Sequence, residues 1–159
     1  MIDVLIIGSG IAGLTAAINA SNNNSKVLVL SKNFPTHSQS VQAQGGINAV
    51  LYEDEDSVDF HIEDTYKASC KLANKDNIKK MCLDAKKAIY WLDSIGVPFN
   101  RTSENKISQR KFGGTNKIRT CYSSDYTGLK ILHTLYDRCI KQNIEFKNEK
   151  RFLSNMFKT

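Results

Sequence analysis

Three glycines near the start of the chain are spaced in a way that suits contact with phosphate groups. Gly8 permits a tight turn, and Gly10 lacks a Cβ atom, so that a pyrophosphate can approach the backbone. Gly13 allows a following helix to pack closely on a preceding strand. The N–H groups and the positive end of that helix would then face the phosphates. The whole motif consists of Gly8, Ser9, Gly10, Ile11, Ala12 and Gly13.

The motif lies between segments that fit a strand and a helix, which is the context that dinucleotide binding requires. Val4–Ile7 is a short apolar run, and Ile11–Ser21 is rich in alanine and leucine. Asparagine and serine in residues 21–25 favour a turn, and the β-branched run Lys26–Ser31 predicts a second strand. We therefore predict an α/β chain that begins with a Rossmann-like βαβ unit and a parallel sheet. The alternative is a plain glycine turn.

The end of the predicted second strand departs from the usual dinucleotide pattern. An acidic residue normally holds a ribose hydroxyl at this place. Here the place is taken by Ser31 and Lys32. The departure disfavours an ordinary NAD site and leaves the contact with the adenosine half open.

Beyond the second strand, the sequence predicts helices separated by loops. Residues 32–51 and 100–119 are predicted as loops, and the second is long enough to suggest a functional role. Apolar spacing predicts helices over 58–73, 76–95 and 127–142, followed by one or two strands. The residues predicted to face inward are Ile78, Met81, Cys82, Ala85, Ile89 and Leu92 in one helix and Leu129, Leu132, Leu135, Tyr136 and Cys139 in another.

The composition is that of an ordinary globular chain. Of its 159 residues 41% are hydrophobic and 24% charged, and no apolar run approaches the roughly 20 residues that span a bilayer. The N-terminus has no basic stretch before its apolar run, which argues against a secretory signal and favours a cytoplasmic location. No C-x-x-C pair is present, so free thiols are expected and a metal site is not. The cysteines are Cys70, Cys82, Cys121 and Cys139.

The net charge of +6 has two interpretations. A nucleic-acid patch is one, but the lysines are scattered, and pairs such as Lys79-Lys80 and Lys86-Lys87 fit the solvated face of a helix. We therefore expect no nucleic-acid partner. A basic site would also suit an anionic cofactor or a dicarboxylate.

Three further blocks carry a resemblance to a known family. They are AQGG within residues 38–51, QRKFGG at residues 109–114 and DYTGLKILHTL at residues 125–135. In this order they resemble the N-terminal part of the flavoprotein subunit of succinate dehydrogenase and fumarate reductase, from Met1 to about Glu149. L-aspartate oxidases share the glycine motif and AQGG but usually lack the other two blocks, and they are the alternative.

The resemblance implies an FAD site and a site for a C4 dicarboxylate. The glycine motif would hold the pyrophosphate, and Ser31 and Lys32 would lie near the adenosine half. Gln44 and Gly45 would touch the dicarboxylate, and Phe112 would pack against its carbon chain. The alternatives are that Gln44 is a loop amide and that Phe112 is a core aromatic. Further contacts with FAD would come from Ser38, Gln39, Ser40, Ala43, Gln44, Gly45 and Gly46, the last four beside the isoalloxazine ring.

The third block also has a structural interpretation. Asp125 or Thr127 could cap the start of a helix, which is a common role for these residue types. His133 lies among leucines and is interpreted as a packed or surface histidine rather than a catalyst.

One departure from the family concerns attachment of the flavin. Membrane-bound members usually tether FAD through a histidine five residues before the glutamine of AQGG, and Gln39 occupies that position. An amide cannot act as that nucleophile, and His37 is two residues away. We therefore predict non-covalent FAD, which in the family accompanies a lower flavin potential and favours fumarate reduction.

A second departure is length, because family members are several times longer. The resemblance places the proton-delivering arginine and the other dicarboxylate ligands in later segments, so no catalytic residue is expected here. Residues 1–159 would be an incomplete flavin domain without the capping and C-terminal domains. Alone it is expected to be inactive, and a truncated remnant is a further alternative. The apolar residues expected to lack partners are Phe152, Leu153, Met156 and Phe157.

In the whole protein, the resemblance implies hydride transfer between flavin N5 and a C4 dicarboxylate. Electrons would pass to an iron–sulfur subunit and a membrane-anchor subunit. The protein would then be cytoplasmic and peripheral on the inner face of the plasma membrane.

Overall fold

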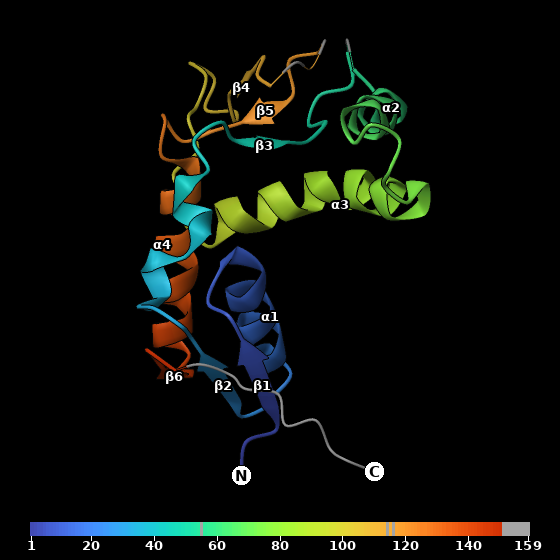
Figure 1. Cartoon of the computed structure of the whole chain (residues 1–159). Helices are drawn as coiled ribbons and strands as arrows, with labels where there is room; N and C mark the ends of the chain where they lie inside the picture. The colour runs from blue at the N-terminus through green and yellow to red at the C-terminus, as the bar shows by residue number, and fades with distance from the viewer. Residues whose placement is uncertain (55, 114, 116, 151–159) are drawn as a thin grey trace. The chain divides into compact units, whose positions relative to one another are not determined.

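The structure is a computed structural model, and it describes residues 1–54, 56–113, 115 and 117–150. The chain divides into two compact units. Among the described residues, the first contains 1–43 and 128–150, and the second contains those between 44 and 127. Figure 1 shows the helices and strands of both units. The apolar residues expected to lack partners, Phe152, Leu153, Met156 and Phe157, lie outside the described residues.

A three-stranded parallel sheet forms the framework of the first unit. Its strands are β1 (Val4–Ile7), β2 (Val27–Leu30) and β6 (Glu145–Lys147), with β2 in the middle. Helix α1 (Ile11–Asn22) connects β1 to β2 (Figure 1). The βαβ prediction is therefore confirmed, and the strand predicted after residue 144 pairs with β2.

Helix α4 (Thr127–Lys141) leads into β6 and supplies core residues to the first unit. Leu132, Leu135 and Cys139 are fully buried, as the sequence predicts, and Ile131 joins them although it was not predicted. The Cys139 thiol donates to the Leu14 carbonyl at 3.8 Å, which ties α4 to α1.

The predicted loop over residues 32–51 contains short ordered pieces. They are the 3-10 helices η1 (Pro35–His37) and η2 (Gln39–Gln42) and the two-residue strand β3 (Ile47–Asn48). Segments of two to four residues are too short to show a hydrophobic period, which explains why the sequence did not reveal them.

Two helices of the second unit begin and end at residues with clear local signals. In α2 (Val58–Ala68) the Ser57 hydroxyl accepts from the Phe60 N–H at 3.2 Å. This helix ends before the predicted Ala73, because Cys70 and Lys71 adopt φ values of 52° and 63°. Left-handed backbone cannot continue a right-handed helix.

Helix α3 (Lys75–Ser94) is capped at both ends. The Asn74 side chain accepts from the N–H of Asp76 at 2.8 Å. At the other end Gly96 has a φ of +104°, and the Val97 N–H donates to the Leu92 carbonyl at 3.0 Å. This is a Schellman ending, which satisfies a helix carbonyl that would otherwise lack a partner.

The predicted inward stripe of α3 is narrower than expected. Ile78, Cys82, Ile89 and Leu92 are buried, but the prediction for Met81 was wrong, since its side chain is 52% exposed. Met81 lies at the edge of the stripe, about 60° around the helix from Ile78, because each residue turns the helix by about 100°.

A small antiparallel sheet completes the second unit. Strand β5 (Thr120–Cys121) lies between β3 and β4 (Gln109–Arg110) (Figure 1). An isolated bridge between Arg101 and Ile107 precedes it. The prediction of one loop over residues 100–119 was therefore wrong at β4, whose length of two residues gives no alternating pattern.

Candidate functional site

The glycine motif forms a tight turn between β1 and α1. Gly8 has a φ of +106°, a conformation that favours glycine. A Cβ atom on Gly13 would lie 2.0 Å from the Gly8 carbonyl oxygen, so the third glycine lets α1 pack closely on the end of β1. A Cβ atom on Gly10 would lie 3.2 Å from the Ser40 hydroxyl oxygen. The tight turn predicted at Gly8 and the close packing predicted at Gly13 are confirmed.

At the N-terminus of α1, backbone N–H groups are available as hydrogen-bond donors. The N-cap residue is Gly10, which has no side chain to accept a hydrogen bond from the first turn. The Ile11 N–H donates to the Ser40 hydroxyl at 3.2 Å, and the helix adds the positive end of its dipole. Unpaired N–H groups at such an end form an anion-binding position.

A hollow of 190 Å³ lies beside this turn and is lined by residues distant in the sequence. The hydroxyls of Ser9 and Ser31 share a hydrogen bond of 2.7 Å at its buried side, while Lys32 is exposed. The Ser38 hydroxyl oxygen is buried and has no hydrogen-bond partner among the described residues. The lining residues are Gly8, Ser9, Gly10, Ser31, Lys32, Asn33, Phe34, His37 and Ser38.

Gly128 holds the segment that follows this hollow. Its N–H donates to the Ala43 carbonyl at 2.7 Å, and a Cβ atom on it would lie 2.0 Å from the Ser40 carbonyl oxygen. No role was predicted for Gly128 from the sequence. The signal was its position in the third block, directly after Thr127, where the structure begins α4. Gln39 and Ala43 are exposed on this segment.

In the second unit, Phe112 packs directly on Gly45. A Cβ atom on Gly45 would lie 2.2 Å from Cε1 of the Phe112 ring, so this contact requires glycine. Gly46 has a φ of +122°, and a Cβ atom there would lie 2.4 Å from the Cys121 carbonyl oxygen. Gln44 is exposed. The structure thus brings together the three residues for which the resemblance implies contact with a dicarboxylate, and Phe112 is not a core aromatic, since it is 50% exposed.

Arg110, for which no role was predicted from the sequence, contacts the corner formed by Gln44 and Gly45. Its Nη2 atom lies 3.0 Å from the Gly45 carbonyl oxygen and 3.4 Å from those of Gln44 and Ser124. Its Nη1 atom lies 3.5 Å from the Asp125 carboxylate. Four acceptors therefore surround one guanidinium.

Aromatic rings flank the same guanidinium. Its central carbon lies 4.3 Å from the centroid of Tyr122 and 5.2 Å from that of Phe112. Both distances fit cation–π attraction. The sequence signal for this arrangement was the arginine two residues before the phenylalanine of QRKFGG.

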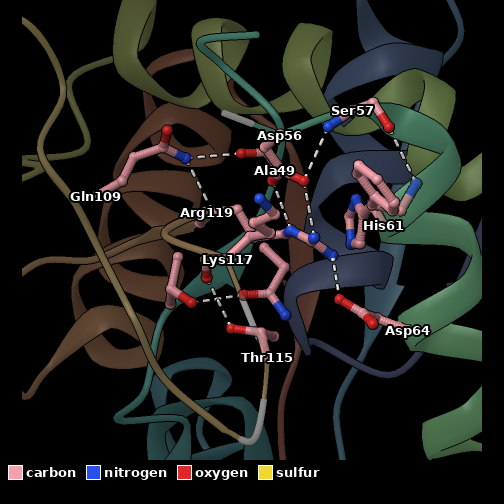
Figure 2. Close-up of polar contacts among 12 residues, drawn as sticks. Ala49, Asp56, Ser57, His61, Asp64, Gln109, Thr115, Lys117 and Arg119 are labelled. Atoms are coloured by element: carbon pink, nitrogen blue, oxygen red, sulfur yellow. Dashed lines mark hydrogen bonds and ion pairs between the residues drawn. The ribbon is translucent and has the colours of Figure 1, made fainter. Parts of the chain in front are cut away.

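The side chain of the neighbouring Gln109 forms hydrogen bonds to the backbone of the small sheet. Its Nε2 group donates to the carbonyls of Ala49 at 2.7 Å and Arg119 at 2.9 Å (Figure 2). The Ala49 N–H also donates to the Arg119 carbonyl at 2.9 Å. These bonds fix the strand that carries Arg110.

A buried ion cluster joins Arg119 to Asp56 and Asp64, as Figure 2 shows. The Arg119 guanidinium makes two hydrogen bonds to Asp56, at 2.7 and 2.8 Å, and its Nη1 atom lies 3.0 Å from Asp64. Arg119 is fully buried. Nearby His61 is 3% exposed, and burial, followed by the charge of Arg119, lowers its pKa. None of these four residues was singled out from the sequence.

The remaining reactive side chains do not form a second site in the described residues. All four cysteines are free thiols, and burial raises the pKa values of Cys121 and Cys139 to about 12. Across the described ranges, no group of histidine, cysteine and acidic side chains is placed to hold a metal ion. His133 is exposed. In the described part of the chain, no helix is both long and apolar enough to cross a membrane.

Comparisons with known proteins find flavoprotein subunits that are similar to this chain. The succinate dehydrogenase flavoprotein subunit of Rickettsia bellii is 43% identical over 153 residues, which cover 91% of this chain and 26% of that protein. The 8-methylmenaquinol:fumarate reductase flavoprotein subunit of Wolinella succinogenes is 41% identical over 154 residues, covering 95% of this chain and 25% of that protein. The chain thus spans about a quarter of the length of these relatives.

A solved structure of E. coli quinol fumarate reductase matches with a TM-score of 0.87 and 33% identity. The match covers 93% of this chain and 26% of that chain. A family model of the FAD binding domain matches residues 3–154. The chain therefore belongs to the FAD binding domain family, and over nearly all its length it is similar to flavoprotein subunits of succinate dehydrogenase and fumarate reductase.

Proposed function

We propose that this chain binds FAD and forms the N-terminal portion of the flavoprotein subunit of a fumarate reductase or succinate dehydrogenase. The observation that carries the proposal is the start of α1, whose N-cap residue Gly10 has no side chain to cap it, beside the hollow lined by Gly10, Ser31 and Ser38. Residues 1–159 would be part of an FAD domain whose capping and C-terminal domains lie elsewhere in the longer protein.

The residues of the first unit fit a dinucleotide. The turn at Gly8–Gly13 leaves the backbone open to a pyrophosphate, and the N–H groups of α1 would donate to its oxygens. Ser31 and Lys32 line the hollow. They would lie near the ribose, where a hydroxyl and an ammonium group replace the usual carboxylate. The unpartnered hydroxyl of Ser38 is a further polar group for FAD. Gln39, Ser40 and Ala43 would continue this contact.

The residues of the second unit fit the reacting end of the cofactor. Gln44, Gly45 and Gly46 would present backbone N–H groups to the isoalloxazine ring, since glycine lets a flat ring approach. The Gln44 amide and the Gly45 backbone would orient a C4 dicarboxylate, and the Phe112 ring would cover its carbon chain. Bound FAD would supply the hydride acceptor or donor, and the chain would supply orientation and electrostatics.

The proposal includes non-covalent attachment of FAD. Gln39 is the first residue of η2, and its amide is not a nucleophile. His37 is the last residue of η1, and Ser38 separates it from Gln39. A tether through His37 would require this segment to be rebuilt.

In the longer protein, electrons would pass to an iron–sulfur subunit and a membrane-anchor subunit, which would hold the flavoprotein at the membrane surface. The resemblance implies these partners, and the likeness to the Wolinella succinogenes 8-methylmenaquinol:fumarate reductase flavoprotein subunit supports a place in an assembly of subunits. Proton delivery and the remaining dicarboxylate ligands would come from its other segments, so the 159-residue chain would not turn over alone.

A flavin titration tests the central claim. The purified chain is mixed with FAD, and quenching of flavin fluorescence is followed, with AMP and NAD as competitors. We expect saturable FAD binding that NAD does not displace. Absence of binding by the folded chain, judged by its circular dichroism, would contradict the proposal. The longer protein would then be assayed with fumarate, succinate and aspartate, and turnover of aspartate instead of succinate or fumarate would contradict the substrate assignment.

A further inference from the structure

Arg110 holds the backbone of the Gln44–Gly45 corner from one side. Its Nη2 atom lies within hydrogen-bond distance of the carbonyl oxygens of Gly45, at 3.0 Å, and Gln44, at 3.4 Å. These two carbonyls belong to consecutive peptide groups. One cation therefore faces the oxygen ends of both.

The N–H ends of the same peptide groups belong to Gly45 and Gly46. In a planar trans peptide, the N–H and the C=O point in opposite directions, so both N–H groups point away from Arg110. Among the described residues, neither N–H has a hydrogen-bond acceptor. The corner thus has one occupied side, which faces the guanidinium, and two unused donors that face away from it.

The guanidinium is itself held in place. The rings of Tyr122 and Phe112 flank it at 4.3 and 5.2 Å, and the Asp125 carboxylate lies 3.5 Å from Nη1. The Arg110 side chain is 29% exposed and that of Asp125 is 79% exposed, so water screens the carboxylate more than the carbonyl contacts. A positive charge at a carbonyl oxygen polarises the peptide and makes its N–H a stronger donor.

We propose that Arg110 is a positioning residue that orients and polarises the Gln44–Gly45 and Gly45–Gly46 peptides, so that the N–H groups of Gly45 and Gly46 become strong donors for the flavin ring. The identity of the ring rests on the proposed function. The orientation of the peptides does not. Stronger donors stabilise negative charge, so Arg110 would strengthen FAD binding and raise the reduction potential of the bound flavin.

The test compares Arg110→Gln, Arg110→Lys and Asp125→Asn in the 159-residue chain. Arg101→Gln is the matched control, because Arg101 is in the same unit and pairs with Asp93. The first readout needs no flavin: the ¹⁵N–¹H signals of Gly45 and Gly46. We expect Arg110→Gln to move both protons upfield, with Arg110→Lys between it and the unsubstituted chain. Asp125→Asn, which removes the competing anion, moves them downfield.

The second readout is made with FAD. We expect Arg110→Gln to weaken FAD binding about tenfold, the effect of one lost charge-assisted hydrogen bond. It lowers the flavin potential, whereas Asp125→Asn raises it and Arg101→Gln leaves it unchanged. A merely structural role for Arg110 would not give shifts of opposite sign in two folded variants.

The outcomes separate this proposal from the previous one. If the unsubstituted chain does not bind FAD but the glycine signals move as expected, the proposed function fails and the positioning role stands. If Gly45 and Gly46 signals stay unchanged in Arg110→Lys and Asp125→Asn, the positioning role is overturned whether or not FAD binds. Asp125→Asn decides the matter even if Arg110→Gln does not fold, because Asp125 is an exposed side chain.

Discussion

The guanidinium of Arg119 and the carboxylate of Asp56 face each other through two hydrogen bonds, Nε to Oδ2 at 2.7 Å and Nη2 to Oδ1 at 2.8 Å. Neither side chain is open to water, with exposures of 0% and 6%. Asp56 precedes α2 and Arg119 precedes β5, so the pair joins a helix to the small sheet that carries the Gly46 and Arg110 segments. Loss of this pair would therefore disturb the Gly46 and Arg110 segments at the proposed substrate site.

Replacing Arg119 by methionine should destabilise the chain strongly. The change leaves Asp56 and Asp64 without their cation, and breaking a buried pair costs about 3–5 kcal/mol. Urea unfolding followed by circular dichroism measures the loss. The matched control is Lys106→Met, which breaks an exposed pair with Glu104 and should change stability little. If the two substitutions lowered the free energy of unfolding equally, the buried pair would not contribute the stability expected of it.

Stability should fall as the pH drops below the ordinary pKa of histidine. Burial lowers the pKa of His61 below 6.5 in the folded chain, while the unfolded chain keeps the ordinary value. Below pH 6.5 the unfolded state therefore binds a proton that the folded state does not, and the free energy of unfolding decreases until the folded pKa is reached. The charged groups facing His61 are Arg119, Asp56 and Asp64.

Comparison of pH 7.5 with pH 5.5 measures this effect. His61→Gln should remove much of the decrease, whereas His133→Gln, at an exposed position, should keep it. A decrease of the same size in His61→Gln would show that another group is responsible.

Gly13→Ala should damage both packing and FAD binding. The new Cβ atom would lie 2.0 Å from the Gly8 carbonyl oxygen, so α1 must move away from β1. Overpacking of this kind costs about 1–3 kcal/mol. Thermal unfolding and FAD titration measure the two effects, with Ala16→Ser on an exposed position of α1 as the control. Unchanged FAD affinity in Gly13→Ala would argue against a pyrophosphate at this turn.

Bound flavin should be released completely by acid. With Gln39 at the position of the usual histidine, denaturation in trichloroacetic acid should leave all of the yellow flavin in the supernatant. The absorbance of the washed pellet at alkaline pH checks this. The control is Gln39→Ala, which should release its flavin equally. Flavin that stays with the precipitate would contradict non-covalent attachment.

One thiol should react much faster than the other three. Cys70 is exposed, whereas Cys82, Cys121 and Cys139 are buried. Because burial raises the pKa values of Cys121 and Cys139 to about 12, almost no thiolate is present there at pH 8. A disulfide reagent should modify one thiol rapidly in the native chain and all four after unfolding. Rapid modification that persists in Cys70→Ser would contradict this burial.

Local signals were enough to predict the framework of the chain. The strand–helix–strand start rests on apolar runs and a glycine turn that neighbours in sequence specify, and the structure shows it as β1, α1 and β2. Helix α4 follows its 3.6-residue period in the same way, with Leu132, Leu135 and Cys139 buried. The sequence blocks also led to a resemblance to succinate dehydrogenase and fumarate reductase flavoprotein subunits, which the comparisons confirm as similar to this chain. The chain belongs to the FAD binding domain family.

Only the tertiary structure decided which distant residues meet. Arg110 reaches the Gly45 carbonyl across 65 positions in the sequence, and Arg119 reaches Asp56 across 63. Periodicity reports how one segment presents a face, and it carries no information about which segment lies opposite. A charge such as Arg119 is therefore indistinguishable in sequence from a solvated one, and its role comes from the partners that folding brings to it.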